Sequence, residues 1–182
     1  MSPAADDGSA MGAGSPAMDD ELLVEDFGQR IGRAMGWPPM AGRLGGVLML
    51  SPDPMTLSEL QEALGASKGS VSEMTRLLIT NGTVERVKVP GVRQAGYVWR
   101  DDAWSGCLQH QLDQTQQLFE LAQVARERGA DLSEVQRARL RDMHTYYDFM
   151  VRELRRLLAE YQGLRAPSGP RPTDVPPSGP SR

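Results

Sequence analysis

Two short amphipathic segments joined by a tight turn constrain this chain more than any other feature. Residues 56–59 form the S/T-x-x-E capping box that satisfies amide donors at a helix start, and they predict a helix from there to residue 64. Residues 65–67, Gly-Ala-Ser, supply a turn. In residues 68–81, three side chains recur with the spacing of a helix that packs by one side only. These side chains are Val71, Thr75 and Leu78. The pattern predicts a helix-turn-helix.

A β-hairpin is predicted directly after this unit, over residues 84–100. Its strands are indicated by a β-branched run at Val84, Val87 and Val89 and by a second short run at residues 97–99. Proline and glycine residues, which favour turns, lie between the two runs. No acid lies between residues 86 and 100, although the whole chain has a net charge of −4. The four basic residues there are Arg86, Lys88, Arg93 and Arg100. The pattern predicts a basic wing; a charged hairpin on a solvated surface is the alternative.

The face of the 68–81 helix that points away from its apolar side carries short polar and basic side chains. They are Lys68, Gly69, Ser72, Glu73 and Arg76, with Ser70 near the leading edge. Short hydrogen-bonding side chains near a helix N-terminus allow the helix end to approach a phosphate or a base edge closely. Asn81-Gly82 is expected to end this helix, because glycine adopts positive φ readily.

Residues 56–100 resemble the winged helix of the MarR family. The run SKGSVS at residues 67–72 and the later G-x-R-x-x-x-Y of Gly91, Arg93 and Tyr97 are similar to the GbsR-like branch, as is GWPPMAGRLGGVLMLS upstream. The resemblance covers about residues 20–161. It implies a dimeric transcription regulator in which the second helix, residues 67–81, enters the major groove, while the wing, residues 84–100, lies along the backbone or in the minor groove.

Site residues follow from this resemblance by position. The DNA-binding set comprises Ser67, Lys68, Gly69, Ser70, Ser72 and Arg76 in the recognition helix and Arg86, Lys88 and Arg93 in the wing. Glu73 departs from the basic or neutral residue expected at its position. Its carboxylate is suited to accept a hydrogen bond from cytosine N4, but it would repel a phosphate, and the sequence leaves both alternatives open.

Two helices are predicted before the helix-turn-helix. Apolar residues fall every fourth position in residues 19–35, after three acids that suit a helix N-terminus. Trp37-Pro38-Pro39 breaks this helix, and residues 40–50 predict a second, more apolar one that ends before Pro52. Gly45-Gly46 inside it indicates close packing.

Two long helices are predicted after the wing. The first covers about residues 102–128 and ends at Gly129. Asp131 with Glu134 resembles a capping box that opens the second. In that last helix, apolar residues follow a heptad spacing for three repeats, which predicts a dimerisation seam. The seam comprises Leu140, Met143, Tyr147, Met150, Leu154, Leu157 and Tyr161. Packing of the seam onto the preceding helix of the same chain is the alternative.

The fold class predicted overall is mainly α with a small β-hairpin, a winged helix-turn-helix flanked by an N-terminal helix and two long C-terminal dimerisation helices. The domains expected are a disordered tail at residues 1–18, the DNA-binding domain at 19–100, the helical dimerisation region at 101–162 and a Pro-rich disordered tail at 163–182. Two recognition helices about 34 Å apart suit a palindrome. The protein is expected to be a cytoplasmic homodimer that binds double-stranded DNA sequence-specifically and regulates transcription, more often as a repressor. A winged-helix protein-interaction module is the alternative.

Composition argues against several other classes. One cysteine, Cys107, excludes an intramolecular disulfide, and with only two histidines no metal site or other cofactor is expected. The longest apolar stretch is far shorter than a bilayer-spanning helix, so no membrane partner is expected. No catalytic residues are identified and no enzyme is expected. The MarR resemblance implies that a small-molecule effector binds between the helices and the DNA-binding lobe, but no residue pattern names it. Cys107 on a helix stripe favours a buried, inert thiol over a redox trigger.

Overall fold

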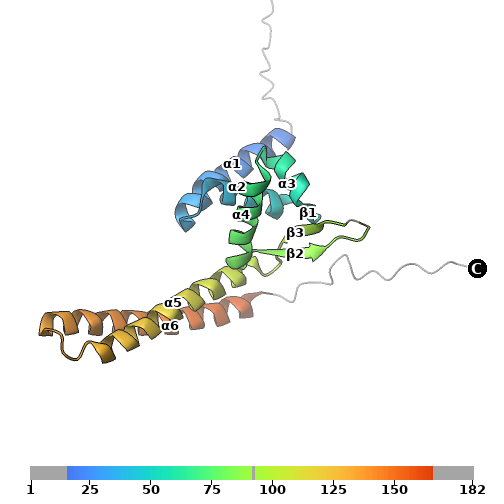
Figure 1. Ribbon diagram of the computed structural model, residues 1–182. Coiled ribbons are helices and arrows are strands. Elements are labelled where there is room, and N and C mark those ends of the chain that lie inside the picture. The colour runs from blue at the N-terminus through green and yellow to red at the C-terminus, as the bar shows by residue number, and fades with distance from the viewer. Residues whose placement is uncertain (1–15, 92, 166–182) are drawn as a thin grey trace, which may run out of the picture.

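A computed structural model describes residues 16–91 and 93–165. Six helices and a small sheet form within these ranges, and the two long C-terminal helices extend as a hairpin away from the lobe that holds the rest (Figure 1). The elements are α1 (Pro16–Met35), α2 (Pro39–Leu50), β1 (Met55–Thr56), α3 (Leu57–Leu64), α4 (Lys68–Thr80), β2 (Val84–Lys88), β3 (Ala95–Trp99), α5 (Ala103–Arg128) and α6 (Glu134–Leu164).

The boundaries of the outermost helices differ from the predicted tails. α1 begins three residues earlier than Asp19, at Pro16, because proline is well tolerated at the first helical position, where its missing amide donor has no helical partner anyway. α6 continues to Leu164, two residues past the predicted boundary. Residues 1–15 and 166–182, the remainder of both predicted tails, lie outside the described residues.

Helices α1 and α2 cross closely because α2 carries glycines on the contact face. A Cβ at Gly42 would lie 2.6 Å from the Phe27 carbonyl oxygen, and one at Gly46 would lie 2.7 Å from the Phe27 ring. Both glycines are buried, as is neighbouring Gly45. Gly46 therefore serves the close packing that was predicted for the Gly45-Gly46 pair, whereas a Cβ at Gly45 would make only an ordinary contact with the Trp99 ring at 3.5 Å.

Local capping sets the start of both helices of the helix-turn-helix. Thr56 accepts from the Glu59 amide at 3.3 Å, and the Glu59 carboxylate accepts from the Thr56 amide at 2.7 Å, which completes the predicted capping box. Gly65 in the turn adopts φ 59°, and Ser67 caps α4 by accepting from the Ser70 amide at 3.3 Å. Gly82 ends the unit at φ 73°. The predicted helix-turn-helix is confirmed.

The sheet has three antiparallel strands in the order β1–β3–β2. Strands β2 and β3 form the predicted hairpin, with Arg86 opposite Tyr97 and Lys88 opposite Ala95. Strand β1, which the sequence pattern did not indicate, adds Met55 opposite Tyr97 on the other edge of β3. A two-residue strand is too short to produce an alternating pattern, and only its pairing with β3 defines it.

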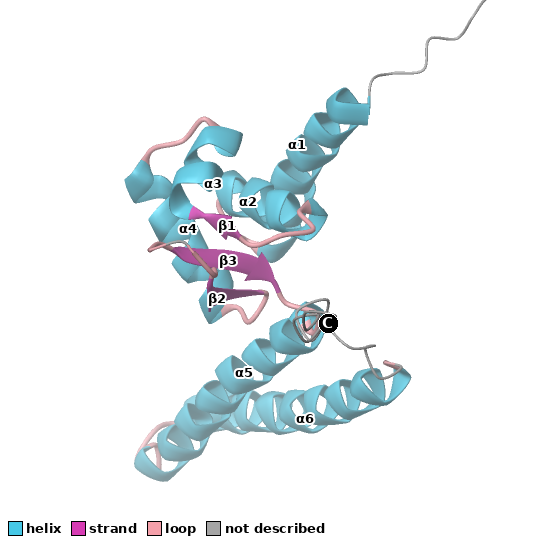
Figure 2. Ribbon diagram, turned by 90° about the vertical axis from the view of Figure 1, so that its right-hand side faces the viewer, coloured by secondary structure: helices cyan, strands magenta, loops and turns pink. Residues whose placement is uncertain are grey.

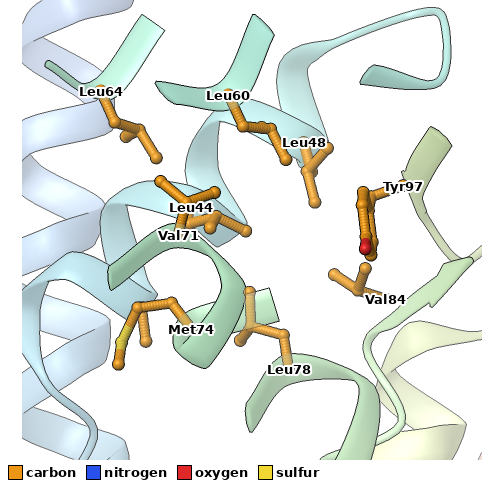
Figure 3. Close-up of a cluster of buried hydrophobic side chains, with 10 residues drawn as sticks. Leu44, Leu48, Leu60, Leu64, Val71, Met74, Leu78, Val84 and Tyr97 are labelled. Atoms are coloured by element: carbon orange, nitrogen blue, oxygen red, sulfur yellow. The ribbon is translucent and has the colours of Figure 1, made fainter. Parts of the chain in front are cut away.

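The core of the winged lobe gathers apolar side chains from α2, α3, α4 and the hairpin (Figure 3). Val71, Thr75 and Leu78 of α4 are buried as their spacing predicts, together with Met74. The opposite side of α4 consequently remains outside the core. The labelled side chains of this cluster are Leu44, Leu48, Leu60, Leu64, Val71, Met74, Leu78, Val84 and Tyr97.

Helices α5 and α6 pack side by side as an antiparallel hairpin (Figures 1 and 2). Its core joins Leu112 of α5 to Val151, Leu154 and Leu158 of α6. The expected Asp131–Glu134 capping box is wrong: Ser133 is the N-cap, and its hydroxyl and amide pair with Gln136. The helix begins at Glu134, and its N-cap lies two residues after Asp131, so Asp131 is outside the capping position.

The winged lobe meets the helical hairpin at a backbone-to-backbone contact. A Cβ at Gly106 of α5 would overlap the Gly82 carbonyl group at the end of the helix-turn-helix. At the same junction Arg165, just after α6, donates to the Asp101 carbonyl. None of the helices in the described ranges has both the length and the apolar character of a bilayer-spanning segment.

Candidate nucleic-acid interface

The predicted recognition residues lie on the uncovered side of α4. Ser67, Lys68, Gly69 and Arg76 are exposed, and Ser70 and Ser72 are half-buried. Ser67 to Ser72 lie at the N-cap and in the first turns of α4, and Arg76 lies one turn further along the helix. The Ser67 hydroxyl also has a structural task, because it caps α4. Arg76 lies back along the helix, where its Nε donates to the Ser72 carbonyl at 3.2 Å.

The wing presents its cations by strand alternation. In β2 the exposed positions are Arg86 and Lys88, two residues apart and hence on one face of the strand. Arg93 is exposed in the loop that joins the strands. The next residue, Gln94, is tied to α3, because its Oε1 accepts from the Ser58 hydroxyl at 3.4 Å. Neither this contact nor the pairing of β1 with the wing was predicted, since both join segments far apart in the chain.

The cations of α4 and the wing are exposed and have no acidic partner among the described residues, which other exposed arginines such as Arg33 and Arg128 also lack. Lys68, Arg76, Arg86, Lys88 and Arg93 form no ion pair with any residue in the described ranges. Elsewhere, arginines of α1, α2 and α6 pair with carboxylates of their own chain. These five unneutralised cations, with Glu73 as an unpaired acid on α4, favour a local positive potential around α4 and the wing despite the net charge of −4.

Arg100, the fourth basic residue of the predicted wing, belongs to a different environment. Its Nε and one terminal nitrogen both donate to the Asp102 carboxylate at 2.8 Å. This hydrogen bonding holds the pKa of Asp102 below its usual range, and the positive charge of Arg165 acts in the same direction. Arg100 therefore stabilises the start of α5 and does not add a free cation to the wing.

The centre of the heptad seam predicted for dimerisation packs inside the chain. Leu154 is only 6% exposed, and Met150 packs against the same cluster on α5. Of the seven seam residues, Leu157 is the one that is clearly exposed, at 49%. The alternative left open by the sequence, a hairpin within one chain, thus describes the centre of the seam. A side chain that is buried against α5 has little surface left for a partner chain.

A second set of apolar side chains on α6, which shares Leu157 with the seam, remains exposed. Its side chains include Val135 at 62% exposure, Phe149 at 50% and Leu164 at 82%. Their spacing places them on one side of the helix, away from α5. We call them the α6 stripe: Val135, Tyr146, Phe149, Leu157 and Leu164. Helix α5 exposes Leu118, Leu121 and Val124 as well.

Comparisons with known proteins agree with this arrangement. Residues 102–164 match the model of the MmpR5-like MarR family transcriptional regulators, and residues 46–88 match the IclR helix-turn-helix domain. A solved structure described as a transcriptional regulator superposes with a TM-score of 0.73 at 29% identity, covering 80% of this chain and 99% of the other. The family model covers α5 and α6, and the helix-turn-helix model covers α3, α4 and β2.

Individual relatives carry related names. The chain is 31% identical over 123 residues to the HTH-type transcriptional regulator MmpR5 of Mycobacterium tuberculosis, which covers 67% of this chain and 74% of MmpR5. It is 37% identical to the HTH-type transcriptional repressor OpcR of Bacillus subtilis over 43% of this chain. This match spans less than half of OpcR, 42% of its length. The placement in the GbsR-like branch stays a prediction. The fold, the exposed side of α4 and the extent of the MmpR5 match together show that the chain belongs to the MarR family and is a helix-turn-helix transcription regulator.

Proposed function

We propose that this chain is a sequence-specific repressor that binds a palindromic site on double-stranded DNA as a homodimer in the cytoplasm. The exposed side of α4 would enter the major groove, with Ser67, Lys68, Gly69, Ser70, Ser72 and Arg76 at the contact, while Arg86, Lys88 and Arg93 of the wing meet phosphates. The observation that carries this proposal is the exposure of the cations of α4 and the wing on a helix-turn-helix unit, without an ion pair to any described residue.

Unpaired cations favour a polyanionic partner for an energetic reason. A surface ion pair within the chain gains at most about 1 kcal/mol, so leaving five cations unpaired costs the fold little. Each cation that neutralises a phosphate releases a condensed counterion, and this makes DNA affinity fall linearly with the logarithm of the salt concentration. A winged helix that binds protein through the same surface would lack this steep dependence.

Salt dependence of DNA binding tests the proposal. The preferred site is first selected from random duplex DNA, and its affinity is then measured at several salt concentrations for the wild type and for Arg93→Ala. We expect the slope of log affinity against log salt to decrease by about 0.9 for each protomer whose Arg93 contacts a phosphate. Arg128→Ala, which removes an exposed cation from the last turn of α5, serves as the control and is expected to leave the slope unchanged.

Two outcomes would contradict this assignment. Selection that enriches no sequence would favour the protein-interaction alternative. Equal slopes for Arg93→Ala and Arg128→Ala would exclude the wing from the DNA contact even if α4 binds.

A second copy of the chain is the expected partner for the α6 stripe. Burial of one large apolar side chain contributes about 1.5–3 kcal/mol before entropic costs, and the stripe offers five such side chains that the chain itself leaves uncovered. Two-fold symmetry would apply the same stripe of both protomers to each other, with help from α5 and from Leu22 and Leu23 of α1.

Sedimentation measurements on the stripe variants test the dimer. Phe149→Glu places a charge in the stripe and is expected to shift the wild-type dimer to a monomer. Ala159→Glu adds the same charge at an exposed α6 position that lies off the stripe, and it should remain dimeric. A monomeric wild type at micromolar concentration would refute the homodimer.

A further inference from the structure

Glu73 is an acid in the middle of a surface that is otherwise polar and basic. It is the sixth residue of α4, on the exposed side, one turn after Gly69 and three residues before Arg76. An unneutralised carboxylate facing DNA phosphates raises the free energy of binding. Its presence on this side of α4 therefore needs an explanation in the fold or in the ligand.

The fold supplies no such explanation. Glu73 forms no hydrogen bond or ion pair with any residue in the described part of the chain. Arg76, the nearest cation at helical spacing, directs its Nε to the Ser72 carbonyl. The helix dipole stabilises a negative charge only in the first turn of a helix, and Glu73 lies beyond the first turn of α4. These contacts therefore give no reason to expect that removal of the carboxylate would lower the stability of the fold.

Gly69, one turn before Glu73, supports the same interpretation. A Cβ at Gly69 would meet only the Ser67 hydroxyl, at 4.0 Å, and its backbone does not have positive φ. Glycine lowers helix stability relative to alanine, and nothing in the described chain requires it here. Helical side chains lean toward the N-terminus, so the Glu73 side chain leans toward the open space above Gly69. The absence of a side chain at Gly69 thus leaves space one turn before the Glu73 carboxylate.

We infer that Glu73 is a specificity-determining residue that accepts a hydrogen bond from the N4 amino group of a cytosine in the major groove, next to the open space at Gly69. Among the groups that base pairs present in this groove, amino groups are the hydrogen-bond donors, and Glu is a common acceptor for cytosine N4. This inference rests on the proposed DNA binding by α4. It explains why the carboxylate is unpaired, since an ion pair with Arg76 would compete with the base.

Base-pair preference separates this role from simple repulsion. The full chain and its variants Glu73→Ala and Glu73→Gln are used to select sites from random duplex DNA. Affinities are then measured at one salt concentration for the selected site and for each single base-pair replacement. We expect the wild type to prefer C·G at one position of each half-site by about tenfold.

The variants should differ in a defined way at that position. Glu73→Ala is expected to lose the preference there and to keep it elsewhere. Glu73→Gln is expected to shift it toward A·T, because Gln pairs with the N6 and N7 of adenine. Glu62→Ala removes an exposed acid of α3 that also forms no ion pair with any described residue. It should keep the wild-type preference, and it therefore controls for the change in net charge.

Other outcomes would overturn the inference. If Glu73→Ala selects the same bases and binds every sequence more tightly, the carboxylate only repels phosphates. If the wild type prefers A·T at the position affected, the assignment to cytosine is wrong. A wild type that selects no sequence overturns the proposed function itself, so failure of the two proposals is distinguishable.

Discussion

Replacement of Gly106 by alanine should destabilise the protein, because the junction between the winged lobe and the helical hairpin has no room for a methyl group. A Cβ at Gly106 would lie 2.8 Å from the Gly82 carbonyl carbon and closer still to its oxygen. The obstacle is backbone, which cannot rotate away. The turn that contains it is held by hydrogen bonds from Gly82 N to the Ile79 carbonyl and from Thr83 N to the Leu78 carbonyl, both 3.0 Å.

The magnitude follows from two opposing contributions. Alanine in a helix is about 1 kcal/mol more favourable than glycine. Overpacking a filled site costs about 1–3 kcal/mol, and a rigid neighbour on the other side of the contact favours the upper end of this range. The net loss is therefore about 2 kcal/mol, which corresponds to a decrease in Tm of about 4–8 °C for a chain of this size.

Urea unfolding followed by circular dichroism measures this loss, with the protomer concentration held fixed because association would stabilise the native state. Gly163→Ala on α6 is the matched control. A Cβ there would meet nothing within 4 Å, so this variant should be at least as stable as the wild type. If Gly106→Ala matches or exceeds the stability of the wild type, the junction can yield and the steric argument is wrong.

Three further predictions concern local chemistry. Ser133→Ala should lower stability by about 1 kcal/mol by removing the α6 cap, whereas Asp131→Asn should leave thermal unfolding unchanged. Asp102→Asn should cost at most about 1 kcal/mol, since the pair with Arg100 is partly exposed. Because the pKa of Asp102 is lowered in the fold, this difference from the wild type should be constant above about pH 5 and shrink in acid unfolding as the pH falls through that lowered pKa. Burial raises the pKa of the Cys107 thiol, so a thiol reagent should modify it far more slowly in the native than in the unfolded chain, and equal rates would contradict this.

Much of the helix-turn-helix was predictable because its determinants are local. The Thr56–Glu59 capping box and the buried face of α4 depend on residues at most a few positions apart, and so does the turn at Gly82. The exposure of Arg86 and Lys88 follows from strand alternation in the same way. A near miss shows the limit of this approach. Asp131–Glu134 and Ser133–Gln136 both fit a capping pattern, and the sequence pattern alone did not identify where α6 begins.

Contacts between distant segments decided the rest. Strand β1 exists because Met55 pairs with Tyr97, and Ser58 reaches a residue 36 positions away at the wing. The apolar periodicity of α6 was evident in the sequence, but only the packing against α5 shows that Leu154 faces inward while Phe149 remains uncovered. The sequence by itself determined which helices form and which of their sides are apolar, since periodicity and capping are local properties. The tertiary structure decided which apolar side is covered and which cations are left without a partner, because both depend on what another segment brings into contact.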